Sequence, residues 1–254
     1  MSIFEYKELE LATRKWRVAK VLPDPAEDLF QLAKQQARLK SKYTMPYSQA
    51  GIVRDAETKY QRQFMGCLAE IYAEQFLKEC LQEWQFEEKY FIRRYDNVRT
   101  DGFKSPANEY DLQLVDAANA TAYKIECRSS VAYDRSLQKA LEQYDIIGPY
   151  SSSAKEAESY SHIYIRPLYE VVNAEQKNYN ANHFEKLITD GAILFYIAGG
   201  CFRKDMIEKG YRKSMQQGNT YYRVVKLTEG YDAVNFKNEL RSKIEWINEK
   251  KNEY

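Results

Sequence analysis

Tyr110-Asp-Leu-Gln-Leu-Val115 and Tyr123-Lys-Ile-Glu-Cys-Arg128 are the two stretches that decide the fold. In each of them apolar and polar residues alternate, which is the period of a β-strand with one face in a core. The residues between them, Asp116-Ala-Ala-Asn-Ala-Thr121, have the composition of a turn. The pattern therefore predicts a β-hairpin.

The same alternation predicts on which side of the sheet the charged residues of the hairpin lie. If both apolar faces enter one core, Asp111, Glu126 and Arg128 project to the same side of the sheet. An antiparallel register of this parity can set Asp111 opposite Glu126, with Cβ atoms about 4.5 to 5.5 Å apart. Two carboxylates this close repel each other unless a cation joins them. Because oxygen ligands on a sheet suit Mg²⁺, the hairpin predicts a divalent-metal site, beside which a cationic side chain can neutralise charge on a phosphoryl group.

Outward from the hairpin, helical and strand-like segments interleave. Residues 1–54 look helical and polar, with a helix that starts near Pro25, and a longer helix is expected over 55–81. The further expected strands are 88–95, 162–166, 192–198 and 221–227; a turn-rich stretch covers 97–108; further helices are expected over 136–147, 182–189 and from about 236. The interleaving predicts an α/β or α+β fold.

Length and composition limit the class of protein. The 254 residues are enough for one large or two small domains, and 44% hydrophobic and 30% charged residues exclude a disordered or collagen-like chain. The 38 Lys+Arg against 37 Asp+Glu exclude a strongly basic DNA coat, although a local basic cluster could still bind nucleic acid.

The cysteine and histidine residues exclude several kinds of site. The four cysteines form no CxxC pair and only two histidines are present, which argues against a zinc ribbon, a disulfide framework and a histidine triad. Cys67 and Cys127 are interpreted as small core residues, and His162 and His183 as surface or capping residues. With neither an apolar run of about 18 to 20 residues nor a signal-peptide pattern, the protein is expected to be cytoplasmic, with no membrane partner.

Asp111 followed by Glu126-Cys-Arg128 resembles the PD-(D/E)XK nuclease superfamily, to which many restriction endonucleases belong. Gly66-Cys-Leu-Ala-Glu70 is similar to the Gly-x-x-x-Glu segment of that superfamily's first helix. The expected elements also run in the superfamily's order, with a helix carrying Glu, a strand, a strand with Asp, a strand with Glu-x-Lys, a helix and a strand. The resemblance covers roughly residues 55–165.

The resemblance implies a restriction endonuclease-like core, a central mixed sheet flanked by helices, over residues 55–200. Residues 1–54 would be an N-terminal helical segment and residues 201–254 a C-terminal extension packed on the core. It also implies that Asp111 and Glu126 bind Mg²⁺, for which Mn²⁺ can substitute, that the Cys127 carbonyl completes the metal shell and that Glu70 is an auxiliary ligand. Arg128 would occupy the usual lysine position.

Two departures from the superfamily pattern leave alternatives open. Tyr110 stands where Pro is usual, and Arg128 replaces a lysine; an arginine stays protonated and cannot act as a base, so Lys124 is a substitute cation to consider. Glu74 rivals Glu70 on the same helix strip. Asp111 and Glu126 could also be a solvated pair on an exposed sheet face, and Arg128 a structural ion-pair partner of Glu126.

The function that we expect is metal-dependent endonucleolytic hydrolysis of DNA phosphodiester bonds, in restriction or antiviral defence. The expected partner is double-stranded DNA, and a homodimer would cut both strands. A catalytically inactive nuclease-fold protein that binds nucleic acid or serves as a scaffold is the alternative, and an adaptor without a nucleic-acid partner is a third.

Overall fold

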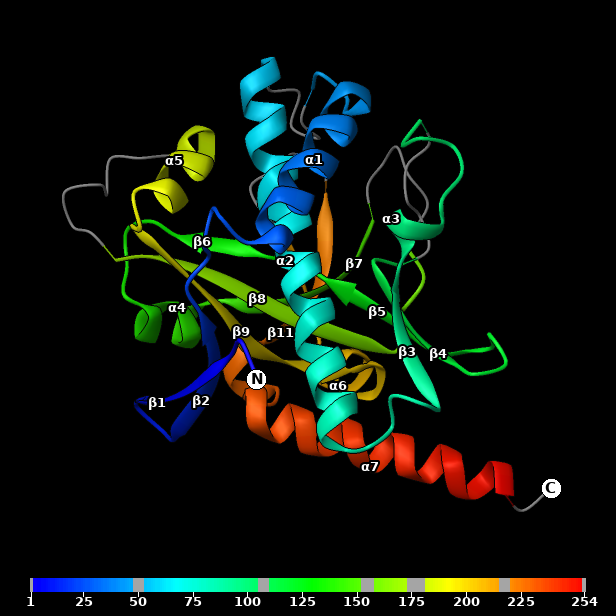
Figure 1. The fold of residues 1–254 in the computed structure, drawn as a ribbon. Helices are drawn as coiled ribbons and strands as arrows, with labels where there is room; N and C mark the ends of the chain where they lie inside the picture. The colour runs from blue at the N-terminus through cyan, green and yellow to red at the C-terminus, as the bar shows by residue number, and fades with distance from the viewer. Residues whose placement is uncertain are drawn as a thin grey trace.

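An eight-stranded mixed sheet runs through the computed structural model, which describes residues 2–47, 53–104, 110–151, 158–172, 181–214 and 220–252 (Figure 1). Its order is β1-β2-β9-β8-β5-β4-β3, and the short β6 pairs with β8. The strands are β1 (Glu5–Glu10), β2 (Lys15–Val21), β3 (Tyr90–Arg94), β4 (Leu112–Asp116), β5 (Thr121–Cys127), β6 (Ser130–Ala132), β8 (Ile163–Val171) and β9 (Ile193–Phe202).

Helices cover one face of this sheet. They are α1 (Asp28–Tyr43), α2 (Ala56–Glu83), α5 (Phe184–Thr189) and α7 (Ala233–Asn252), with η2 (Ala181–His183) leading into α5 and the short α3 (Tyr95–Val98) following β3. Figure 1 shows α2 crossing the sheet. Asp55 caps α2, since its Oδ1 accepts a hydrogen bond from the Thr58 backbone N–H at 2.7 Å. Phe64 and Tyr72 of α2 pack in one buried cluster with Leu112, Ile125 and Phe195 of the sheet.

The opposite face carries a second layer. A three-stranded sheet, β10-β11-β7, packs there with two short helices. These elements are α4 (Leu137–Gln143), β7 (Asp145–Ser151), α6 (Arg203–Glu208), β10 (Tyr211–Ser214), β11 (Tyr221–Lys226) and η3 (Leu227–Glu229). Leu141, Met206 and Val225 form a second buried cluster with Tyr164 and Tyr196 of the large sheet. The mixed α/β class, with a large mixed sheet flanked by helices, is therefore confirmed.

The prediction of helix throughout residues 1–54 is wrong for its first half. β1 and β2 form an antiparallel hairpin, and β2 continues the large sheet by pairing with β9. Trp16 and Val18 enter the second cluster whereas Ala19 and Val21 enter the first, which is the period-two pattern of a strand buried on both faces. The expected helix near Pro25 is confirmed as α1.

The predicted helix over 136–147 is too long. It ends at Gln143, because Tyr144 adopts an extended backbone (φ −87°, ψ 158°). The chain then continues as β7, which pairs with β11. The other expected helices and strands are present near their predicted bounds, and the turn-rich stretch 97–108 lies partly outside the described residues.

The C-terminal residues contribute to the same core. Phe236, Leu240 and Ile244 of α7 pack in the first cluster, and β9 runs on to Phe202. Gly199 has a positive φ of 132°, and a Cβ there would lie 2.0 Å from the Tyr231 carbonyl oxygen. None of the described helices is long and apolar enough to span a membrane.

Candidate active site

The predicted hairpin is present, with β4 and β5 antiparallel. Leu112 lies opposite Ile125, so Asp111 and Glu126 are the next residues at the same end of the two strands. Leu112, Ile125 and Cys127 are buried in the first cluster, as the alternation predicts. The parity argument therefore sends both acidic residues to the side away from that cluster.

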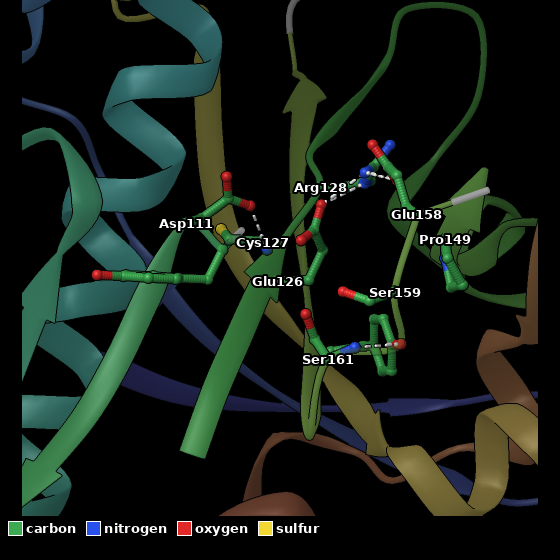
Figure 2. A pocket seen from close by; sticks show the side chains of 10 residues that line it. Asp111, Glu126, Cys127, Arg128, Pro149, Glu158, Ser159 and Ser161 are labelled. Carbon is green, nitrogen blue, oxygen red and sulfur yellow. Dashed lines mark hydrogen bonds and ion pairs between the residues drawn. The ribbon is translucent and has the colours of Figure 1, made fainter. Parts of the chain in front are cut away.

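A cavity of about 220 Å³ opens at this end of the hairpin (Figure 2). Asp111, Glu126, Cys127 and Arg128 all line it, so the structure brings together four of the five site residues expected from the sequence. The other lining residues are Tyr110, Pro149, Glu158, Ser159, Ser161 and Tyr164. Figure 2 shows Asp111 and Glu126 side by side, with the backbone of Cys127 between them.

The Asp111 carboxylate accepts a hydrogen bond from the backbone and lies close to other carboxylates. Its Oδ2 accepts a hydrogen bond from the Cys127 N–H at 2.8 Å. Burial raises the pKa of Asp111 well above its ordinary value, and the carboxylates of Glu126 and Glu70 raise it further, whereas the Cys127 N–H and Arg128 oppose the rise. The site therefore concentrates negative charge that a cation would stabilise.

Arg128 connects two carboxylates across the cavity. Its Nη2 lies 2.6 Å from Glu126 Oε1 and 2.8 Å from Glu158 Oε2. Burial opposes the charged form of Arg128, but Glu126, Glu158 and Asp111 outweigh it and raise its pKa above the ordinary value. Arg128 is therefore a permanent cation, which excludes it as a general base.

Glu158 is a site residue that the sequence analysis missed. Besides its ion pair with Arg128, Glu158 Oε2 accepts from the Tyr150 N–H at 3.2 Å. It stands 30 positions from Arg128 in the chain, outside any helix or strand. No local pattern marks such a residue, because Glu158 reaches the cavity through its contacts with Tyr150 of β7 and with Arg128.

Glu70 rather than its rival Glu74 is electrostatically coupled to the site. Glu70 does not line the cavity, but its charge contributes to the raised pKa of Asp111. Its Oε2 lies 3.5 Å from Nζ of Lys40, a residue of α1 that also binds Asp96. Glu74 instead forms an ion pair with Arg94, whose side chain is buried. Lys40 is the second residue that the sequence analysis missed.

The remaining candidate residues from the sequence make contacts that are structural: Lys124, His162 and the two cysteines. Lys124 does not line the cavity, and its Nζ lies 5.7 Å from the centroid of the Tyr110 ring. His162 Nδ1 accepts a hydrogen bond from the Lys124 N–H at 3.0 Å. Cys67 and Cys127 are free and buried, which confirms their interpretation as core residues, and burial raises the pKa of both thiols.

The donor set at the hairpin end suits a hard divalent cation. Mg²⁺ is typically bound through one or two carboxylates and keeps waters and phosphate oxygens in its other positions. Asp111 and Glu126 are two such carboxylates, and their place in the lining of one cavity favours a cation there. Across the described residues, no group of three or more His, Cys, Asp or Glu side chains is arranged to hold a metal ion. A site here would thus rest on two carboxylates.

The chain matches no protein-family model, and neither the curated proteins nor the solved structures gave a match.

Proposed function

We propose that the protein is a metal-dependent endonuclease of the PD-(D/E)XK type that hydrolyses DNA phosphodiester bonds. The observation that carries the proposal is the meeting of Asp111 and Glu126, from neighbouring strands, in one cavity with Arg128. Two acids and a permanent cation around an open cavity suit the binding of a divalent ion and a phosphate.

The order and pairing of the elements support this proposal. α2, β3, β4, β5, α4 and β8 follow one another in the order expected of the superfamily core. β3, β4 and β5 are antiparallel neighbours, and β5 pairs in parallel with β8, where Glu126 stands beside Tyr164. A crossover through α4 and β7 connects these two parallel strands, as a parallel pair requires.

In the proposed reaction each residue has a distinct role. Asp111 and Glu126 would hold Mg²⁺ or Mn²⁺, with the Cys127 carbonyl as a third oxygen donor and Glu70 as an auxiliary group. The bound metal would supply Lewis-acid polarisation of the phosphate and an activated water. Arg128 would donate hydrogen bonds to the phosphoryl oxygens as negative charge develops on them. Arg128 contacts Glu126 and Glu158 through Nε and Nη2, so it would donate to the phosphate through Nη1 without giving up either carboxylate.

Double-stranded DNA as the substrate, a homodimer and a role in restriction or antiviral defence remain part of this proposal. A protein that carries one such site cuts one strand at a time, so a double-strand break would need two copies. The defence role follows from the resemblance alone.

The test is a cleavage assay on supercoiled plasmid with Mg²⁺ or Mn²⁺. Wild-type protein should nick the plasmid only when the metal is added, and Asp111→Asn and Glu126→Gln should each abolish nicking. Asp190→Asn is the matched control, since Asp190 is an exposed aspartate at the end of α5, paired with Lys186, and does not line the cavity. Cleavage that persists in both site variants would refute the assignment.

A catalytically silent nucleic-acid-binding protein is the second candidate. The observation in its favour is the close ion pair of Arg128 with Glu126, which occupies a carboxylate that the metal would need. DNA binding that weakens with salt, without cleavage in either metal, would support this candidate over the enzyme. Absence of both binding and cleavage would reject both.

A further inference from the structure

A second and larger cavity lies next to the candidate active site. Its volume is about 670 Å³, within the range of about 300 to 1,000 Å³ of small-molecule sites. Arg128 lines both cavities, so they meet at that side chain. The residues that line the second cavity are Arg62, Met65, Arg128, Ser129, Ser130, Val131, Tyr133, Arg135, Gln143, Tyr144, Asp145, Ile147, Arg166, Lys213 and Tyr222.

Basic side chains dominate the charge of this lining. The cationic residues are Arg62, Arg128, Arg135, Arg166 and Lys213, and Asp145 is the carboxylate among the lining residues. Three of the cations have acidic partners: Glu126 and Glu158 for Arg128, Asp134 for Arg135 and Asp145 for Lys213. Across the part of the chain that the structure describes, neither Arg62 nor Arg166 has a carboxylate at ion-pair distance. The cavity wall therefore carries positive charge that its own carboxylates do not neutralise.

Arg166 is the unusual member of this set, because it is 2% exposed. Its Nη1 donates to the Arg128 carbonyl and its Nη2 to Ser130 Oγ at 2.8 Å, while its Nε has no hydrogen-bond partner among the described residues. Burial lowers the pKa of Arg166 to about 10, so the side chain is still charged at neutral pH. The charge of Asp145 offsets this burial only in part. A buried cation with no carboxylate at ion-pair distance among the described residues is unfavourable, and an anion bound in the cavity would compensate it.

The position of Arg166 in the sheet ties it to the candidate active site. Ile163 and Ile165 of β8 face the first cluster, whereas Tyr164 and Arg166 face the second layer. Tyr164 lines the first cavity and Arg166 the second. Alternate residues of one strand thus line two neighbouring cavities, which suits a ligand that extends along the strand from one to the other.

We propose that the second cavity binds a phosphate group of the nucleic-acid strand that enters the candidate active site, with Arg166 and Arg62 as its cationic ligands. This inference rests on the proposed function. Guanidinium groups match phosphate oxygens geometrically and remain charged, and phosphate contacts of this kind position a strand without reading its sequence.

The test measures how tightly the protein binds a fluorescein-labelled 16-base-pair DNA duplex. Fluorescence anisotropy reports the binding, in EDTA and at a series of salt concentrations. Arg62→Gln and Arg166→Gln should each weaken binding at least about tenfold and reduce the slope of log affinity against log salt by about one. Arg241→Gln is the matched control, since Arg241 is an exposed arginine on α7, paired with Glu245, and does not line the cavity. Circular dichroism and thermal melting check that each variant folds.

A second titration distinguishes the source of the phosphate. Deoxyadenosine 5′-monophosphate is titrated into each variant by calorimetry. If the variants lose binding of this mononucleotide but keep the affinity for the duplex, the cavity is a free-nucleotide site and the strand-phosphate proposal is overturned. Unchanged duplex affinity in folded Arg62→Gln and Arg166→Gln also overturns it. If Arg166→Gln does not fold, Arg62→Gln, whose side chain is exposed, decides the question.

The result of this binding test does not depend on the result of the plasmid-cleavage test, because the binding assay contains no metal and involves no cleavage. Loss of duplex affinity in the two variants supports the phosphate site even if the plasmid is never cut. Failure of the wild type to bind the duplex overturns the phosphate proposal.

Discussion

Asp111→Asn separates the charge of this side chain from its hydrogen bond. The amide oxygen of asparagine can still accept from the Cys127 N–H, which the carboxylate does at 2.8 Å. What the variant removes is a negative charge that burial disfavours and that the carboxylates of Glu126 and Glu70 disfavour further. We therefore expect it to gain stability while it loses metal binding and cleavage, a combination typical of functional sites.

The size of the gain follows from the position of Asp111 in the hairpin. Asp111 and Glu126 are the residues that follow the Leu112–Ile125 pair, and side chains at such opposed positions have Cβ atoms about 5 Å apart. Two unit charges about 5 Å apart repel by roughly 3 kcal/mol at an effective dielectric constant of about 20. The attraction that Arg128 exerts on Asp111 is lost as well, so the expected rise in the free energy of unfolding is about 1 to 2 kcal/mol.

The gain should depend on pH with a definite sign. The pKa of Asp111 is raised in the folded protein above the ordinary value of 3.8, so the folded state binds the proton more tightly than the unfolded chain does. Stability contributed by this group is therefore greatest at low pH and is lost as pH rises through the folded pKa. The stability difference between variant and wild type should vanish near pH 4 and grow toward neutral pH.

Urea unfolding of both proteins from pH 4 to pH 8, without metal, measures this difference. Mg²⁺ should then stabilise the wild type and leave the variant unchanged, since only the wild type binds it. Metal-dependent nicking should fall at least about 100-fold, which is ~2.7 kcal/mol of transition-state stabilisation. With Asp190→Asn as the control, a variant that is no more stable than wild type at neutral pH would refute the charge argument.

Three further substitutions test other parts of the structure. Glu70→Gln should lower the affinity for Mn²⁺ about 10- to 100-fold, as measured by calorimetry. An unchanged affinity would show that Glu70 is not an auxiliary group of the metal site. Glu74→Ala leaves the buried Arg94 without its carboxylate and should reduce the free energy of unfolding by about 3 kcal/mol with no effect on Mn²⁺ binding. Gly199→Ala would place a Cβ 2.0 Å from the Tyr231 carbonyl oxygen, so urea unfolding should show a loss of about 2 kcal/mol or more; a loss below about 0.5 kcal/mol would contradict this close approach.

Sequence patterns predicted the local part of the candidate site. The alternation in the two strands around Leu112 and Ile125 placed their apolar side chains in the core and sent Asp111 and Glu126 to one cavity. Helix α2 was also expected, because its residues are good helix formers without proline.

The secondary-structure predictions were wrong where a strand depends on pairing with another strand far along the chain. β2 is a strand because it pairs with β9, as in the alignment of Ala19 with Ile197. The run from Tyr144 into β7 is extended because β7 pairs with β11. The hydrogen bonds that hold both segments in an extended conformation are supplied by strands far along the chain.

The sequence by itself determined the hairpin and the core-facing side of residues such as Leu112 and Ile125, and it allowed a register that sets Asp111 opposite Glu126. Those features follow from the period of two in an extended backbone, which any segment of that composition carries with it. Only the tertiary structure decided that Glu158 binds Arg128, that Lys40 binds Glu70 and that Arg166 lies buried beside a basic cavity. These contacts join residues tens of positions apart, so they exist only once the loops and layers have packed, and no local period encodes them.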